Sequence, residues 1–137
     1  PNVDQFPIEL YRDAFGEVIR RASIYSGAVI TIEGHSDPLN FLQKEQQGAK
    51  PLELRRIRQS ALNLSAQRAS AVRDAILEMA EAGGEGMDAS QFAIVPMGIS
   101  DPLYIPPQTE AEWLANMRVV FRIVQFEAEA SVFTPLQ

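Results

Sequence analysis

Hydrophobic residues recur along the chain at two different spacings, and these spacings separate helices from strands. Near the amino terminus, apolar residues three or four positions apart predict one face of a helix over 7–23. They are Tyr11, Ala14, Phe15, Val18, Ile19 and Ala22. The same spacing predicts a second long helix that ends before Gly83. The pattern leaves open whether that helix runs unbroken from Pro51 or starts anew near Ser65.

Short runs rich in β-branched residues predict strands over 28–33, 92–98 and 118–126. Pro96 places the middle one near a sheet edge, because proline has no N–H to donate to a neighbouring strand. The chain also has room for an opening strand over 2–6. Strands that alternate with helices predict an α/β domain built as a two-layer sandwich.

Between these elements the pattern weakens. Polar residues fill much of 38–59, which we interpret as an insertion that forms a loop and the beginning of the next helix. A short helix is expected over 110–116, and no pattern marks the tail, 127–137. We expect one domain over 1–137, cut from a longer precursor, because the chain begins with Pro1 and not methionine.

Composition narrows the classes of function. The 137 residues carry a net charge of −6, which argues against nucleic acid as a partner, since that role depends on clustered basic residues. The chain has no cysteine, which excludes disulfides and thiolate metal sites. No apolar run approaches the roughly 20 residues that a membrane span needs, so no span is expected in this domain.

Two opposite charges stand out as candidate ligand contacts. Asp37 follows a strand directly, and Arg68 lies in a strongly helical segment. A guanidinium matches a carboxylate in shape, and a carboxylate accepts several N–H donors. Together they could hold a ligand that bears both an ammonium and a carboxylate. Residue types alone favour the simpler interpretation, an aspartate that caps a loop and an arginine on a solvated helix face.

The single histidine, His35, lies between Glu33 and Asp37, a spacing that hints at metal binding. No second histidine and no cysteine completes a site of the usual ligand types, so packing is the better interpretation and no metal is expected. Ser36 next to His35 and Asp37 does not make a hydrolase triad, because neighbours in sequence cannot converge in that way. We therefore expect no catalytic residues, no cofactor and no enzymatic activity.

Four short motifs in a fixed order resemble the OmpA-like peptidoglycan-binding domain (the type of the OmpA carboxyl-terminal, MotB and Pal domains). They are Gly34-His35-Ser36-Asp37, Leu64-Ser65-Ala66-Gln67-Arg68-Ala69-Ser70-Ala71-Val72, Gly98 followed by Pro102, and Asn116-Met117-Arg118-Val119. The resemblance implies a mixed β-sheet covered by helices on one face, with the insertion 38–59 after the second strand.

The same resemblance implies non-covalent binding of the peptidoglycan stem peptide through diaminopimelate. Asp37 would receive the ammonium of the ligand and Arg68 its carboxylate. Ser36, Asn116 and Arg118 are the further expected contributors, Asn116 by bonding loop backbone and Arg118 by reinforcing the carboxylate end. A domain of this kind anchors a larger envelope protein to the cell wall.

These implications place the domain in the periplasm, attached to the outer or inner membrane through the rest of the precursor. A homodimer is compatible with the sequence. The alternative is an OmpA-like scaffold that has lost ligand binding and contacts other proteins through its insertion. That alternative gains weight if 38–59 folds across Asp37 and Arg68.

Overall fold

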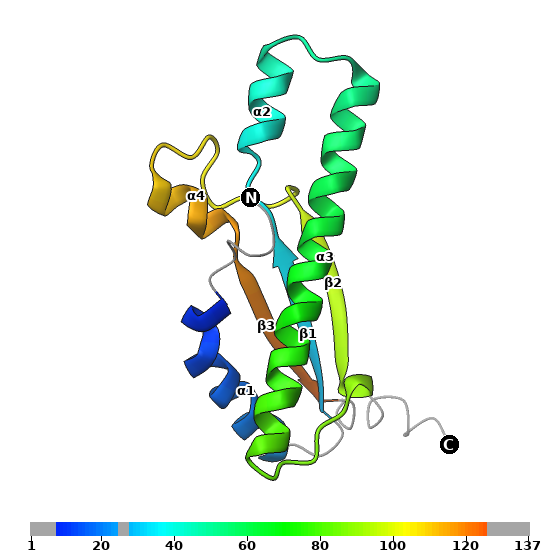
Figure 1. Ribbon diagram of the computed structural model, residues 1–137, viewed down its shortest axis with the longest axis vertical. Helices are drawn as coiled ribbons and strands as arrows, with labels where there is room; N and C mark the ends of the chain where they lie inside the picture. Colours follow the sequence, from blue (N-terminus) through cyan, green and yellow to red (C-terminus); the bar gives the residue numbers. More distant parts are fainter. Residues whose placement is uncertain (1–7, 25–27, 126–137) are drawn as a thin grey trace, which may run out of the picture.

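The computed structural model describes residues 8–24 and 28–125, which form a three-stranded sheet with helices (Figure 1). The elements, in chain order, are η2 (Ile8–Tyr11), α1 (Arg12–Ile24), β1 (Ala28–His35), α2 (Leu39–Gln46), α3 (Pro51–Ala82), η3 (Ala89–Gln91), β2 (Phe92–Gly98), α4 (Glu110–Asn116) and β3 (Val119–Gln125). The strand order is β2-β1-β3, with β2 parallel and β3 antiparallel to β1. The sheet is therefore mixed, as expected, and β2 lies at an edge.

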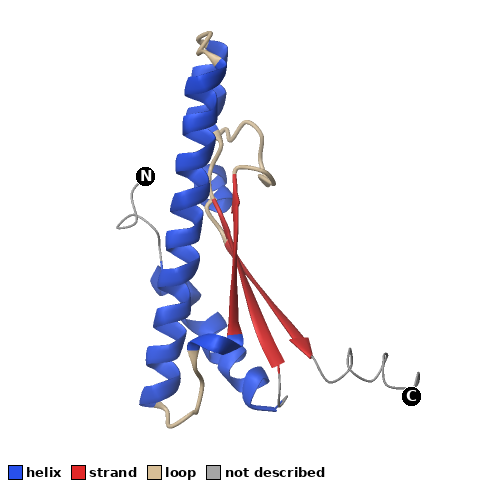
Figure 2. Cartoon of the chain, turned by 90° about the vertical axis from the view of Figure 1, so that its right-hand side faces the viewer, coloured by secondary structure: helices blue, strands red, loops and turns tan. Residues whose placement is uncertain are grey.

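Helices α1 and α3 cover one face of this sheet, so the two predicted layers are present (Figure 2). The core between them consists of buried apolar side chains, most of them from α1, β1 and α3. They are Phe15, Val18, Ile19, Ala22, Ile30, Ile32, Ala69, Val72, Ile76, Ala80 and Val119. The ring of Phe15 meets that of Phe121 edge-on, with centroids 6.2 Å apart, which ties α1 to β3. The predicted α/β sandwich is confirmed.

Helix α3 runs unbroken for 32 residues, which answers the question that the sequence leaves open. Pro51 occupies its first turn, where the missing N–H costs nothing. The helix ends at Ala82, and Gly84 follows with a φ of +79°, a conformation that glycine adopts without strain. At 1.5 Å per residue the helix is about 48 Å long, so its first part extends beyond the sheet (Figure 1).

That first part pairs with α2 to make a helical hairpin over 38–59. The sequence-based expectation of a loop before α3 is wrong for 39–46, which is helical. Phe41 of α2 is buried and packs against Arg58 of α3, while Gly48 turns the chain with a φ of +82°. We call 38–59 the hairpin from here on.

Strand β1 also differs from its prediction, because it continues through Gly34 to His35. Gly34 pairs with Pro96 on one side and Val119 on the other. A Cβ at this position would lie 2.2 Å from the carbonyl oxygen of Ser65 in α3. Glycine is needed here so that the helix backbone can approach the strand, and it does not end the strand.

The remaining elements agree with expectation. Helix α4 has the predicted bounds. Strand β3 begins at Val119, one residue after the predicted start, and reaches Gln125, the last described residue. The first predicted helix opens with the 3₁₀ turn η2. The expected opening strand over 2–6 and the tail over 127–137 lie outside the described residues. Among the helices in 8–24 and 28–125, none combines the length and the apolar composition that a membrane span needs.

Candidate functional site

The candidate site lies at the carboxyl end of β1. The carboxyl end of β2 and the start of β3 lie beside it, so three segments of the chain meet at this corner of the sheet. Ser36, the first residue after β1, fixes this corner. Its N–H donates to the carbonyl of Gly98 over 2.8 Å, and its Oγ donates to the carbonyl of Ala61 over 3.0 Å. Ser36 therefore joins the loop to both β2 and α3.

Asp37 comes next, half-buried, with its carboxylate oriented by two donors. Oδ1 accepts a hydrogen bond of 2.7 Å from the side-chain amide of Asn116, and Oδ2 accepts one of 2.9 Å from the N–H of Leu39. The second bond is a local turn at the start of α2, which matches the loop-capping interpretation. An ionised carboxylate offers about four lone-pair sites, so Asp37 retains capacity for a ligand.

Asn116 is fully buried, with 0% of its surface exposed. Its Oδ1 accepts from the N–H groups of Leu103 and Tyr104, at 2.9 and 3.0 Å. Its Nδ2 donates to Asp37 and, over 2.9 Å, to the carbonyl of Tyr104. Asn116 thus holds the loop before α4 and the carboxylate of Asp37 in one arrangement.

Arg68 lies in the middle of α3 with only 1% of its surface exposed. Burial lowers the pKa of its guanidinium, although arginine keeps its charge in proteins. Ser36, Asp37 and Arg68 line the same cavity, of about 240 Å³. The structure therefore brings the two opposite charges of the motifs to one cavity.

The hairpin supplies part of the wall of this cavity. Asn40 and Phe41 of α2 and Ile57 of α3 line it together with the charged pair. The segment that the sequence marks as an insertion is thus in contact with the space between Asp37 and Arg68. Phe41 is a contributor that sequence reasoning missed, because 38–59 has no clear hydrophobic pattern.

Arg118 takes a different position. Its Nη2 lies 3.5 Å from Oδ2 of Asp101, and its carbonyl accepts a hydrogen bond of 2.9 Å from the N–H of His35. Arg118 and Asn116 are both absent from the lining of the 240 Å³ cavity. Of the expected contributors, three face the cavity, Asn116 supports one of them, and Arg118 lies apart.

His35 is 2% exposed, and its Nε2 lies 3.5 Å from Oε1 of Glu33. Burial lowers the pKa of His35, the charge of Arg118 lowers it further, and Glu33 opposes both. Glu33 itself accepts a 2.6 Å bond from Arg122, which lowers its pKa. In the part of the chain that the structure describes, no three carboxylate or imidazole groups gather as a metal site. Asp37, the third residue of the spacing that hinted at metal binding, accepts hydrogen bonds from Asn116 and from the N–H of Leu39.

Ser65 is a second residue whose position the sequence did not reveal. It is buried inside α3, where its Oγ donates to the carbonyl of Leu62 over 2.8 Å and accepts from the N–H of Gly98 over 3.0 Å. Sequence reasoning considered Ser65 as a helix start, because serine is common there. Its position inside the Leu64-Ser65 motif was the available signal that it does something else.

Comparison with known proteins finds likeness in structure and none in sequence families. No protein-family model and no curated protein sequence matches the chain. The crystal structure of the peptidoglycan-associated lipoprotein from Burkholderia pseudomallei superposes with a TM-score of 0.57 at 22% identity, over 84% of this chain and 78% of the lipoprotein chain.

The periplasmic domain of Helicobacter pylori MotB matches with a TM-score of 0.56 at 17% identity, over 91% of this chain and 70% of that one. Its carboxyl-terminal domain gives 0.53 at 18% identity, over 90% and 81% of the two chains. These proteins carry OmpA-like domains. The chain therefore has the OmpA-like fold that its four motifs predict.

Proposed function

We propose that this domain binds peptidoglycan non-covalently, through the diaminopimelate of the stem peptide, and anchors a larger envelope protein to the cell wall. The observation that carries the proposal is the shared cavity of Asp37 and Arg68, with Ser36 beside them. The printed name of one structural relative, peptidoglycan-associated lipoprotein, supports the same target. On this proposal the domain works in the periplasm as a binding module, without catalysis.

The chemistry of the pair suits an amino-acid head group. The carboxylate of Asp37 would receive the ammonium of diaminopimelate, and the guanidinium of Arg68 would bind its carboxylate. The cavity, at about 240 Å³, is smaller than the roughly 300–1,000 Å³ typical of sites for whole drug-sized ligands. We therefore propose that only the charged end of the diaminopimelate side chain enters, while the rest of the stem stays outside.

The other contributors have supporting roles in this proposal. Ser36 fixes the loop that carries Asp37, through its bonds to Gly98 and Ala61. Asn116 orients the carboxylate of Asp37 from behind. Arg118, which lies outside the cavity lining, would meet a carboxylate further along a longer stem peptide.

The first test needs only the wild-type domain. Calorimetric titration with a stem tetrapeptide that contains meso-diaminopimelate should give heat, whereas the same tetrapeptide with L-lysine in its place, whose side chain has an ammonium but no carboxylate, should give none under the same conditions. The comparison isolates the carboxylate contact that Arg68 would make. Equal binding of the two compounds would contradict the assigned role of Arg68.

Variants then test each partner. Asp37→Ala and Arg68→Ala should each lose about 2–5 kcal/mol of binding free energy, because each leaves a ligand charge unpaired. Arg73→Ala is the matched control, since Arg73 lies on the same helix but forms an ion pair with Asp74 over 3.1 Å. Circular dichroism must show that the variants fold, above all for the buried Arg68.

The anchoring role requires binding to the intact polymer. Purified sacculi should sediment the wild-type domain and leave Asp37→Ala and Arg68→Ala in the supernatant. Sedimentation velocity on the domain alone, without sacculi, would report whether it is a dimer. Binding of the stem tetrapeptide without sedimentation would support the cavity and contradict wall anchoring.

One observation favours a scaffold without ligand as the second candidate. Arg68 is almost fully buried, and the hairpin residues Asn40, Phe41 and Ile57 line the cavity that it shares with Asp37. On this candidate the charged pair is structural and the hairpin contacts other proteins. The absence of heat with every stem fragment, together with failure to sediment with sacculi, would favour it.

A further inference from the structure

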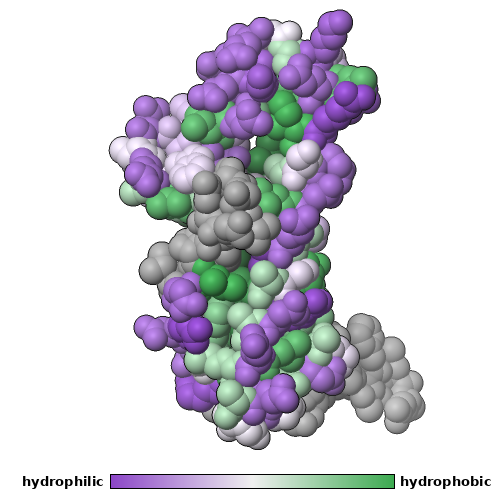
Figure 3. Space-filling model, viewed as in Figure 1, coloured by the Kyte–Doolittle hydropathy of each residue, from purple (hydrophilic) through white to green (hydrophobic). Residues whose placement is uncertain are grey.

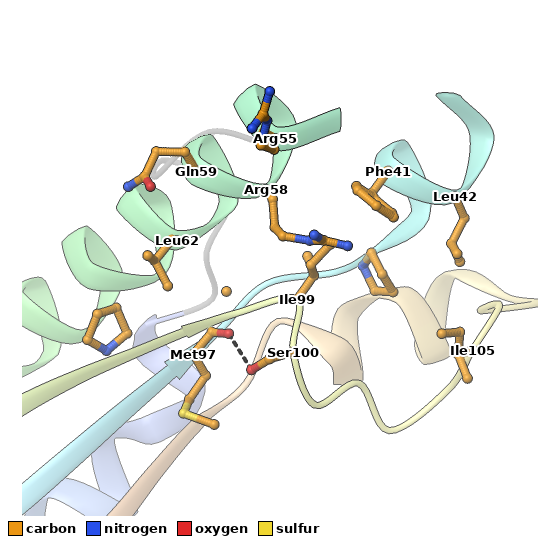
Figure 4. A pocket seen from close by; sticks show the side chains of 13 residues that line it. Phe41, Leu42, Arg55, Arg58, Gln59, Leu62, Met97, Ile99, Ser100 and Ile105 are labelled. Carbon is orange, nitrogen blue, oxygen red and sulfur yellow. Dashed lines mark hydrogen bonds between the residues drawn. The ribbon is translucent and has the colours of Figure 1, made fainter. Parts of the chain in front are cut away.

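A second and larger hollow lies on the other side of Phe41. It has a volume of about 880 Å³ and separates the hairpin from the loop that follows β2. Phe41 and Leu42 of α2, Leu62 of α3 and Ile99 after β2 line it with apolar groups. Ile105, in the loop before α4, forms the opposite side (Figure 4). We call this space the arginine groove, after the two residues described next.

Arg55 and Arg58 of α3 line the arginine groove from the hairpin. Figure 4 shows Arg58 extending from α3 toward Phe41, and its guanidinium carbon lies 4.7 Å from the centre of that ring. Within the described residues, neither arginine forms an ion pair with a carboxylate. Both side chains are exposed, so an arriving anion can reach them.

The rim of the arginine groove exposes apolar side chains to water. Ile105, which lines the groove, is 64% exposed, and Leu103, two residues earlier in the same loop, is 57% exposed. Figure 3 shows hydrophilic surface over the hairpin, with hydrophobic surface visible between its helices. The groove thus combines apolar side chains with two arginines that have no carboxylate partner in the described structure. Protein interfaces are enriched in the same kinds of residue, aromatic side chains and arginine.

The net charge of the hairpin is opposite in sign to the net charge of the whole chain. The hairpin holds five basic and two acidic residues, a net charge of +3, in a chain whose net charge is −6. The field at the groove therefore attracts anions, although the domain as a whole repels them. Charge complementarity of this kind selects an acidic partner and speeds its approach.

We propose that the arginine groove is a docking site for an acidic, apolar polypeptide segment of another protein. Carboxylates of that segment pair with Arg55 and Arg58, while its apolar side chains cover Phe41, Ile99 and Ile105. The site is separate from the cavity of Asp37 and Arg68, with Phe41 as the wall between them. The proposal holds whether or not that cavity binds diaminopimelate.

A polypeptide suits the groove better than the wall polymer does. Glycan strands and stem peptides present mainly hydroxyl, amide and charged groups, which gain little from an apolar floor. Side chains such as leucine or phenylalanine bury apolar area there, at about 25 cal/mol per Å². The volume of about 880 Å³ also has room for more than one side chain.

The test is selection from a phage-displayed random dodecapeptide library on the immobilised domain. The expected winners combine Asp or Glu with Leu, Ile, Phe or Trp. A synthetic, fluorescently labelled winner is then titrated by anisotropy. The double variant R55E/R58E should weaken its binding by about tenfold or more, because reversed charges repel the carboxylates. Ile105→Ser should weaken it as well, through the apolar contact.

Arg56→Glu is the matched control, since Arg56 is exposed on the same turn of α3 but does not line the groove. Its affinity should stay within about twofold of the wild type. Failure to enrich any peptide, winners without carboxylates, or an equal loss with Arg56→Glu would each overturn the proposal. A loss of sacculus sedimentation in R55E/R58E, with no peptide enriched, would also overturn it, because the groove would then belong to the wall polymer.

Discussion

The side-chain amide of Asn116 donates a hydrogen bond of 2.7 Å to Oδ1 of Asp37, which lies 79 residues earlier in the chain. The same side chain bonds the backbone of Leu103 and Tyr104. One buried amide therefore sets both the direction of the carboxylate and the path of the loop before α4. Changes at this position should affect folding and the candidate ligand contact together.

Replacing Asn116 with alanine should lower the free energy of unfolding by at least about 2 kcal/mol. The variant leaves the N–H groups of Leu103 and Tyr104 without their acceptor. Urea denaturation measures the loss. Asn63→Ala is the control, because Asn63 is exposed on α3 and bonds only the side chain of Gln59 in the described structure, so its effect should stay within about 0.5 kcal/mol. Equal effects of the two variants would contradict the role given to Asn116.

Gly34→Ala should destabilise the domain by about 3 kcal/mol, because the new methyl group would lie 2.2 Å from the carbonyl oxygen of Ser65. Gly16→Ala should do the opposite. Gly16 lies inside α1 with nothing within 4 Å of the added methyl group, so alanine gains about 0.5–1 kcal/mol of helix propensity. Thermal unfolding of the pair tests both signs. A tolerated Gly34→Ala would show that α3 can move away from β1.

Ser65→Ala should cost about 1–3 kcal/mol, because the buried N–H of Gly98 loses its acceptor. Ser60→Ala, on the exposed side of the same helix, should change stability by less than about 0.5 kcal/mol. Chemical denaturation of the two variants makes the comparison. If Ser65→Ala is as mild as Ser60→Ala, the bond to Gly98 contributes nothing measurable.

Stability should fall as the pH falls below 6.5, the ordinary pKa of histidine. The pKa of His35 is lower in the folded state, chiefly through burial, so the unfolded chain binds the extra proton first. The loss grows until the pH passes the folded-state pKa. Glu33, whose pKa is also lowered, adds its own loss only below its ordinary value of 4.5.

Melting temperatures between about pH 8 and pH 5 measure this effect. His35→Gln should flatten the profile over that range, because glutamine does not titrate. The nearby charges of Glu33, Arg118 and Asp101 are unchanged in this variant. The same slope in both proteins would assign the pH dependence to other groups.

Much of the architecture follows from patterns that the sequence carries openly. Apolar spacing located α1 and the part of α3 after Ser65, and β-branched runs located the three strands. Helix α2 was missed because Phe41 is its one buried residue, so no repeating stripe exists to detect. The end of β1 was misjudged because glycine usually stops a strand, whereas Gly34 here admits a helix backbone that only the tertiary structure reveals.

Part of the candidate site could also be predicted from the sequence, because short motifs mark some of its residues. The motifs identified Asp37 and Arg68, and the structure places both on one cavity. Ser36 lies there too, while Arg118 lies beside Asp101. The wall that Phe41 and Ile57 add depends on how the hairpin folds back, and nothing local in those residues encodes it. Ligand binding by the five expected residues stays a prediction.

The unbroken length of α3 has a mechanical consequence. Arg58 and Arg68 lie ten residues apart on one continuous rod, and Ala69, Val72 and Ile76 bind the next turns of that rod into the core. A pull on the guanidinium of Arg68 is therefore transmitted axially into the packed layer between helix and sheet, where many contacts share the load. An arginine on a loop would yield by bending. Here tension at the middle of the helix reaches side chains that are packed in the core.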